Sequence, residues 1–173
     1  MGAKTTKEIA QWLCAGGYQD FSQELIDYTK NMALSHLGMT VAGSAMPLGK
    51  IAMEYVRCQD GSVESGVLGS GFQTSVEYAA LANGSLAHTT ELEDDSFPEG
   101  LYSCGSWPTV FAMGEKLHLP GKDIIEAYIL GYEVGARIGM ASEKAIADGY
   151  LNAAGCLTIG SAAMAAKLLK LDV

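Results

Sequence analysis

Glycine recurs at every fourth position of one segment, residues 122–140, as Gly131, Gly135 and Gly139. Each glycine inside a helix costs roughly 1 kcal/mol relative to alanine, so some contact must offset that cost. Residues four apart share one face of a helix, and a face of glycines lets a second helix backbone approach closely. The segment 153–171 is also rich in small residues. We expect these two segments to be helices that pack on each other or on another chain.

Helix signals also dominate the rest of the sequence. A capping box at 5–8 and Pro47 at a first helical position are typical of helix starts, and Gly16–Gly17 is typical of a helix end. A second expected helix starts after Asp20 or Ser22 and runs to a break at 38–45. Further helices are expected over 47–58, from 74 or 75 to 81, and over 108–118. Only 63–68 is expected as a strand or an extended linker. The sequence predicts an all-α helical bundle with little or no β structure.

The charge balance excludes several kinds of partner. The chain has 11 Lys and Arg against 20 Asp and Glu, a net charge of −9 and a pI near 4.7. A nucleic-acid binder needs basic residues to neutralise phosphates, and an anionic membrane surface attracts basic segments. The sequence contains no uninterrupted run of about 18 apolar residues, the length that a membrane-spanning helix needs. We expect neither nucleic acid nor membrane as a partner.

The four cysteines indicate a reducing compartment. They lie at positions 14, 58, 104 and 156, and no pair has the CxxC spacing of a zinc or redox motif. The first residues contain no apolar run typical of a secretory signal. We therefore expect a cytoplasmic protein, and the sequence predicts neither a metal site nor a cofactor.

The densest chemistry lies between residues 79 and 108. Here His88 precedes four acidic residues, Glu91, Glu93, Asp94 and Asp95. If the helix through Asn83–Gly84 resumes, Glu91, Asp94 and Asp95 share a face and repel one another, which suits general acid–base catalysis. His88 would then reach Glu91, three residues on. A divalent cation is a second use for the cluster, although the EF-hand spacing is absent, and a solvated helix end is the third.

Two further residues have ordinary explanations. Cys104 lies between Ser103 and Gly105 in an expected loop, and no histidine has a defined sequence relation to it, so an inert thiol is favoured over a nucleophile. His36 falls on the apolar stripe of the second helix and is expected to be a hydrogen-bonded core histidine.

Several segments together resemble the MmgE/PrpD family, which includes 2-methylcitrate dehydratase and cis-aconitate decarboxylase. They include VLGSGFQTSVEYAALANGSLAHTTELEDD and PTVFAMGEKLHLPGKDIIEAYILGYEVGARI. The resemblance implies that residues 1–173 form a single helical domain, which in the family is joined to a second, α/β domain. It also implies action on small tricarboxylic or related acids without an iron–sulfur cluster, and a homodimer.

The resemblance carries over to individual positions only in part. The acidic motif falls on Glu91, Glu93 and Asp94. One family histidine falls on Leu101 or Ser103, a second on Leu151, and the family lysines would lie beyond Val173. The candidate catalytic residues are Glu91, Asp94, Asp95 and His88, and the candidate substrate-binding residues are Asn83, Ser103, Cys104 and Tyr150.

Two functions from different classes follow. The chain is either a lyase-like enzyme, or one subunit of a split enzyme, that acts on a small carboxylic-acid or carbonyl-bearing substrate by dehydration, decarboxylation or isomerisation. Alternatively it is a non-catalytic relative that serves as a binding or dimerisation partner. A homodimer or a complementary second subunit is expected in either case.

Overall fold

Helices make up most of the described chain, which in this computed structural model comprises residues 2–96, 101–142, 144, 148–149 and 153–173. The helices are α1 (Gly2–Ala15), α2 (Gln23–Ser44), α3 (Pro47–Arg57), α4 (Val76–His88), α5 (Trp107–Lys116), α6 (Gly121–Ala141) and α8 (Ala153–Leu168), with 3-10 turns η1 (Tyr18–Asp20) and η2 (Ser103–Gly105). Two short antiparallel hairpins pair β1 (Ser65–Val67) with β2 (Phe72–Thr74) and β3 (Asp95–Ser96) with β4 (Leu101–Tyr102). The mostly helical prediction is confirmed.

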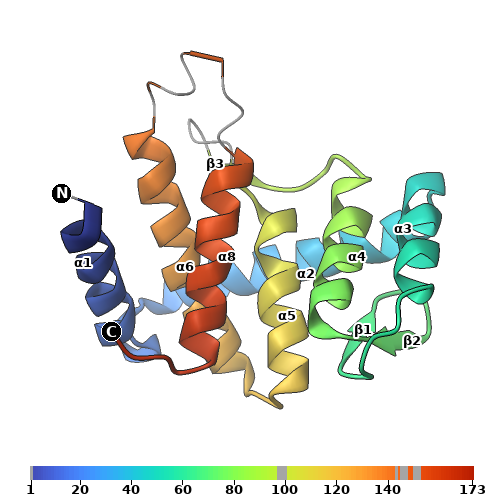
Figure 1. The fold of residues 1–173 in the computed structure, drawn as a ribbon, viewed down its shortest axis with the longest axis horizontal. Helices are drawn as coiled ribbons and strands as arrows, with labels where there is room; N and C mark the ends of the chain where they lie inside the picture. Colours follow the sequence, from blue (N-terminus) through green and yellow to red (C-terminus); the bar gives the residue numbers. More distant parts are fainter. Residues whose placement is uncertain (1, 97–100, 143, 145–147, 150–152) are drawn as a thin grey trace.

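The helices form a row with one long helix behind it (Figure 1). Helices α6, α8, α5, α4 and α3 stand beside one another, and α2 crosses their back, where it contacts α4, α3 and α6. One core cluster joins α3, α4, α5 and β1, and is built from Val56, Val67, Val76, Ala79, Ala82, Leu86 and Ala112. A second joins α5, α6 and α8, and is built from Trp107, Val110, Ile124, Ala127, Tyr128, Met164 and Leu168.

The glycine stripe of α6 packs on α8 within the same chain. A Cβ atom at Gly131 would lie 2.3 Å from Met164 Cγ and 2.8 Å from the Gly160 carbonyl oxygen. A Cβ at Gly160 would in turn lie 3.0 Å from the Gly131 carbonyl oxygen and 3.5 Å from the Cα of Gly135. The two backbones approach too closely for side chains, which confirms the predicted pairing of these helices.

Helix α2 continues through the break that we expected at 38–45. Its N-cap is Ser22, whose Oγ accepts a hydrogen bond from the Leu25 N–H. Near its other end, a Cβ at Gly43 would lie 1.8 Å from the Leu86 carbonyl oxygen. Gly43 therefore serves a close crossing of α2 and α4 rather than a turn, and the chain turns later, before Pro47.

Two other expectations are wrong in detail. Helix α1 begins at Gly2, before the capping box that we expected to start it. The segment expected as the only strand does contain β1, but β1 pairs with β2, and the structure adds the β3–β4 hairpin. Short strands of two or three residues show too few alternations for a period of two to be visible in the sequence.

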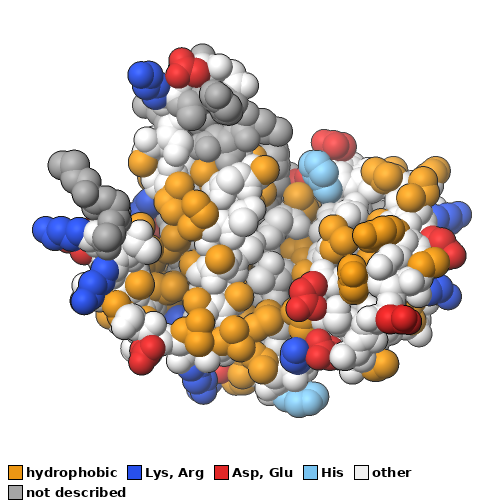
Figure 2. Space-filling model, in the orientation of Figure 1, with side chains coloured by type: hydrophobic (Ala, Val, Ile, Leu, Met, Phe, Trp, Pro, Cys, Tyr) orange, Lys and Arg blue, Asp and Glu red, His pale blue; other side chains and the backbone are white. Residues whose placement is uncertain are grey.

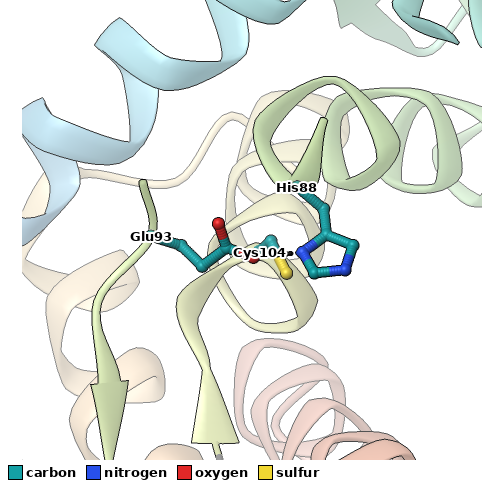
Figure 3. Close-up of side chains that lie close together, drawn as sticks. All are labelled: His88, Glu93 and Cys104. Carbon is teal, nitrogen blue, oxygen red and sulfur yellow. Dashed lines mark hydrogen bonds and ion pairs between the residues drawn. The ribbon is translucent and has the colours of Figure 1, made fainter. Parts of the chain in front are cut away.

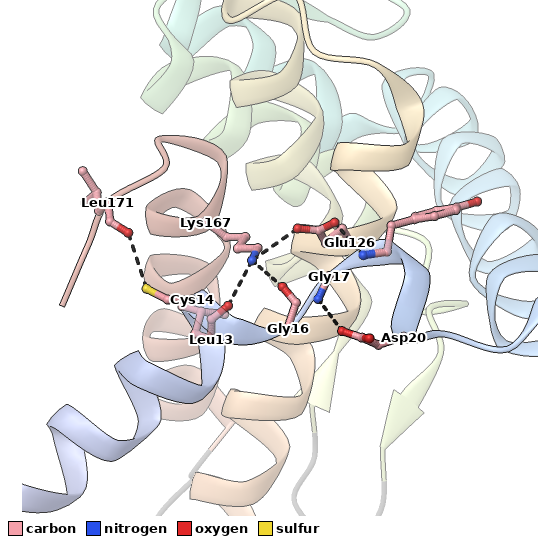
Figure 4. A network of polar contacts seen from close by, with 9 residues as sticks. Leu13, Cys14, Gly16, Gly17, Asp20, Glu126, Lys167 and Leu171 are labelled. Carbon is pink, nitrogen blue, oxygen red and sulfur yellow. Dashed lines mark hydrogen bonds and ion pairs between the residues drawn. The ribbon is translucent and has the colours of Figure 1, made fainter.

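A partly buried cation fastens α1 to the end of the row (Figure 4). Lys167 Nζ on α8 donates hydrogen bonds to the carbonyl oxygens of Leu13, at 3.0 Å, and Gly16, at 2.6 Å. It also pairs with Glu126 Oε1 at 3.2 Å, and Glu126 Oε2 accepts from the Tyr18 N–H. The carbonyls at the end of α1 thus find a charged donor in place of the next helical turn.

In the described part of the chain, no helix is both long enough and apolar enough to cross a membrane.

Candidate functional site

A sharp turn directly after α4 organises the acidic cluster. The helix ends at His88, and the Oγ1 atoms of Thr89 and Thr90 donate to the Ser85 and Ala87 carbonyls, which caps it. Glu91 then adopts a left-handed conformation with φ of 51°. The expectation that the helix continues and aligns Glu91, Asp94 and Asp95 on one face is therefore wrong.

The β3–β4 hairpin then brings two separate segments side by side. Asp95 pairs with Tyr102 in the ladder, and the Ser103 N–H donates to the Asp94 carbonyl at 3.2 Å. This register places the residues before β3 beside those of η2. Helix α4 can approach η2 because Gly84 has no side chain: a Cβ there would lie 2.9 Å from the Cys104 carbonyl oxygen. Gly84 lies inside α4 and permits this contact.

The hairpin and the turn assemble a cluster of His88, Glu93 and Cys104 (Figure 3). His88 Nδ1 contacts Glu93 Oε1, and the ligand-type atoms of the three residues lie within 4.8 Å of one another. The side chain of Glu93 is 4% exposed, whereas that of His88 is 52% exposed. The predicted partner of His88 was Glu91, and this is wrong: Glu93 takes that place.

The thiol in this cluster is held in its neutral form. Burial, followed by the charge of Glu93, raises the pKa of Cys104 to about 12. Because a thiolate is the reactive form of cysteine, this environment does not activate Cys104 as a nucleophile. It agrees with the sequence-based preference for an inert thiol, although a histidine does lie close by.

Several buried polar atoms of the protein lack hydrogen-bond partners in the described part of the chain. Among the described residues, these atoms have no hydrogen-bond partner: both ring nitrogens of His36, Glu93 Oε2, both carboxylate oxygens of Asp94, Ser103 Oγ, Trp107 Nε1 and the Tyr128 hydroxyl. Burial, opposed by the charge of Glu93, lowers the pKa of His36 to about 4. Burial, then the charge of Asp94, raises the pKa of Tyr128. These shifts show that His36 and Tyr128 lie within electrostatic reach of the two carboxylates.

His36 is a core residue, as predicted, and it is fully buried. The predicted hydrogen bonds of its ring are wrong for the described residues, since both nitrogens lack a partner there. A buried polar group without a partner is costly and usually has a role or a bound water. The unsatisfied groups therefore distinguish this region from the apolar core around it.

Two surface grooves meet at His88. One, of about 380 Å³, runs between α4 and the start of α5, and Gly84, Cys104 and Pro108 contribute to its walls. The other, of about 510 Å³, lies between α3 and α4 and is lined mainly by apolar side chains. The first groove gives a small molecule in solution access to the edge of the cluster.

The remaining predicted site residues are dispersed. Glu91 and Asp95 are exposed, and Ser103 is buried beneath the cluster. Asn83 is engaged with the backbone of the first hairpin: its Oδ1 accepts from the Leu68 N–H and its Nδ2 donates to the Gly66 carbonyl, both at 2.9 Å. Tyr150 lies outside the described residues.

Sequence reasoning missed the roles of three residues in this region. It did not identify Glu93 as the partner of His88, and it did not include His36 or Tyr128. Glu93 did carry a signal, because the family resemblance placed it in the acidic motif. His36 and Tyr128 lie far from that motif in the sequence, and the apolar periodicity around each of them explains a core position equally well.

Comparisons with known proteins agree on one family. A family model described as the MmgE/PrpD N-terminal domain matches residues 7–173. Cis-aconitate decarboxylase from Aspergillus terreus is 28% identical over 142 residues, which are 79% of this chain and 29% of that protein. Cis-aconitate decarboxylase from Homo sapiens is 27% identical over 158 residues, 87% of this chain and 33% of that protein. The matched region spans about a third or less of the length of these relatives.

Proposed function

Because this chain belongs to the MmgE/PrpD family, we propose that it forms the helical part of a lyase-type enzyme acting on a small carboxylic acid. The similarity to proteins named cis-aconitate decarboxylase supports this class of substrate. The observation that carries the proposal is the contact between half-exposed His88 and almost fully buried Glu93, at the edge of a groove.

This pair suits proton transfer. A carboxylate in contact with one ring nitrogen fixes the orientation of an imidazole and stabilises its charged form. Dehydration, decarboxylation and isomerisation of carboxylic acids each move a proton to or from carbon or oxygen. In this proposal His88 moves the proton, and Glu93 orients the imidazole of His88.

The proposed substrate also needs positive charge, because a small carboxylic acid is an anion at neutral pH. No Lys or Arg of the described residues forms an ion pair with Glu93 or Asp94. We propose that a complementary subunit or segment supplies the cationic groups that bind the substrate carboxylates. In this proposal the chain is one part of a split enzyme, and its active site is altered because the cationic groups come from the other part.

A second candidate function rests on the apolar groove between α3 and α4. Leu48, Ile51 and Tyr55 are 55–65% exposed there, and Figure 2 shows hydrophobic side chains gathered over these helices on the right of the molecule. Exposed apolar patches of this kind mark protein interaction sites. They support a non-catalytic role as a binding or dimerisation partner.

Turnover by matched variants tests the catalytic proposal. We expect Glu93→Gln to lower kcat by at least about 100-fold on whichever small di- or tricarboxylic acid of a panel is converted, because His88 loses the carboxylate that orients it and a general acid–base group contributes that much. Glu54→Gln, which changes an exposed carboxylate on α3, should retain the wild-type rate. Glu91→Gln tests the position first expected from the sequence, and it should retain the rate if the role belongs to Glu93.

The solution mass of the purified chain, alone and after incubation with lysate from its source, decides where the rest of the site lies. Capture of a complementary subunit that restores turnover would support the split enzyme. Full activity in Glu93→Gln would exclude the proton-transfer role, and a homodimer without turnover on the whole panel would favour the second candidate.

A further inference from the structure

We propose that His88, Glu93 and Cys104 form a binding site for a divalent cation of intermediate softness, of the Zn²⁺ or Co²⁺ class. This inference goes beyond the proposed function and does not depend on it. It also departs from the sequence-based expectation, because spacings of five and eleven residues match no metal motif. The β3–β4 hairpin, not the spacing, brings the three residues together.

The donor types define the class of metal. The cluster offers one imidazole nitrogen, one carboxylate oxygen and one sulfur. Zinc accepts all three, whereas calcium and magnesium prefer oxygen ligands. Three protein ligands with a fourth position for water or substrate are typical of zinc sites that remain open.

The donor atoms lie near the spacing that such an ion requires, but His88 Nδ1 and Glu93 Oε1 are in direct contact and must move apart to admit it. Bonds of about 2.0–2.3 Å in a tetrahedral zinc site separate the ligand atoms by roughly 3.3–3.7 Å. The three donor atoms lie within 4.8 Å of one another. Shifts of about an ångström or less in side chains would therefore complete the coordination, and half-exposed His88 has room to make them.

Unpartnered buried oxygens provide the independent support. Glu93 is 4% exposed, and its Oε2 has no hydrogen-bond partner among the described residues, nor has either carboxylate oxygen of Asp94. Buried carboxylates are normally paired with charges or coordinate metals.

Binding has a defined proton balance. The Cys104 thiol loses its proton when sulfur coordinates the metal, and any proton shared by His88 and Glu93 is released as well. The bound ion replaces these protons as the positive partner of the carboxylates. Affinity should therefore rise with pH.

Cobalt binding to the full chain tests the site directly, under reducing conditions and after treatment with a chelator. We expect one equivalent of Co²⁺ to produce a near-ultraviolet cobalt–thiolate charge-transfer band, which Zn²⁺ abolishes by displacement. Cys104→Ser should remove the band. Cys58→Ser should retain it, although Cys58 also lies beside a carboxylate, with Sγ 3.9 Å from Glu54 Oε1.

Two further variants keep the test independent of any folding defect in Cys104→Ser. Glu93→Gln and His88→Ala should each weaken Co²⁺ binding by at least about tenfold, the effect already expected for outer-shell partners of a metal. Circular dichroism should show all variants folded. The absence of a band in the wild type, or an unchanged band in Cys104→Ser, would overturn the proposal. Neither readout uses turnover, so failure of the metal site and failure of the proposed enzyme remain distinguishable.

Discussion

At the scale of single residues, the unusual member of the structure is His36. It is completely buried in α2, its ring nitrogens have no hydrogen-bond partner among the described residues, and burial lowers its pKa to about 4. The folded protein therefore holds a neutral imidazole at pH values where an unfolded chain, with a pKa near 6.5, already binds a proton.

This difference predicts a loss of stability in mild acid. Between pH 6.5 and pH 4 the unfolded state takes up a proton that the folded state does not, so the free energy of unfolding should fall by about 3 kcal/mol over that range. Urea unfolding at several pH values measures it. His36→Leu should flatten this part of the profile, and His118→Gln, at an exposed histidine, should not. An identical slope in His36→Leu would show that other groups cause it.

The sequence pointed to the stretch that carries the cluster but not to the pairing of its side chains. It singled out His88, Asp94, Ser103 and Cys104, which the structure gathers in one region. It paired His88 with the wrong acid because helical spacing was extended beyond residue 88. The left-handed turn at Glu91 reverses the chain there, and such turns usually carry glycine or asparagine, so a glutamate gave no local signal.

At the scale of elements, Gly131 of α6 and Gly38 of α2 have opposite consequences. Gly131 faces α8 at a distance that leaves no space for a methyl group, whereas nothing lies within 4 Å of a Cβ at Gly38. The sequence could predict the first contact because three glycines on one face require a partner. It could not predict that α2 continues past Gly38, since an isolated glycine inside a helix resembles a break.

Two alanine substitutions separate these cases. Gly131→Ala should destabilise the fold by about 1–3 kcal/mol, because the new methyl group meets Met164 Cγ and the Gly160 carbonyl. Gly38→Ala should instead stabilise it by about 0.5–1 kcal/mol through helix propensity alone. Thermal melts of the two variants beside the wild type measure both effects. Equal melting temperatures for all three would contradict the packing of α6 on α8.

At the scale of the whole molecule, α1 depends on one side chain from the other end of the chain. Lys167 is 15% exposed and bonds two carbonyls at the end of α1 as well as Glu126. The sequence predicted α1 and α8 but not this connection, because a lysine in the last turn of a helix is explained equally well by the helix dipole.

Loss of this cation should loosen α1. We expect Lys167→Met to lower the free energy of unfolding by about 2 kcal/mol, the scale of hydrogen bonds to charged groups, and to increase hydrogen exchange in α1 before the rest of the chain. Lys30→Met removes an exposed pair with Asp27, and should leave the stability close to that of the wild type. Unchanged exchange in α1 would show that its apolar face alone holds it in place.

The hairpin after α4 also has a consequence for inheritance. His88, Glu93 and Cys104 lie in one continuous stretch of the chain, and Gly84, which lets that stretch fold back on α4, lies one helical turn before it. A single short run of codons therefore encodes the entire cluster. A gene that is split, fused or recombined anywhere outside that run passes the cluster on intact, whichever partner later completes its surroundings.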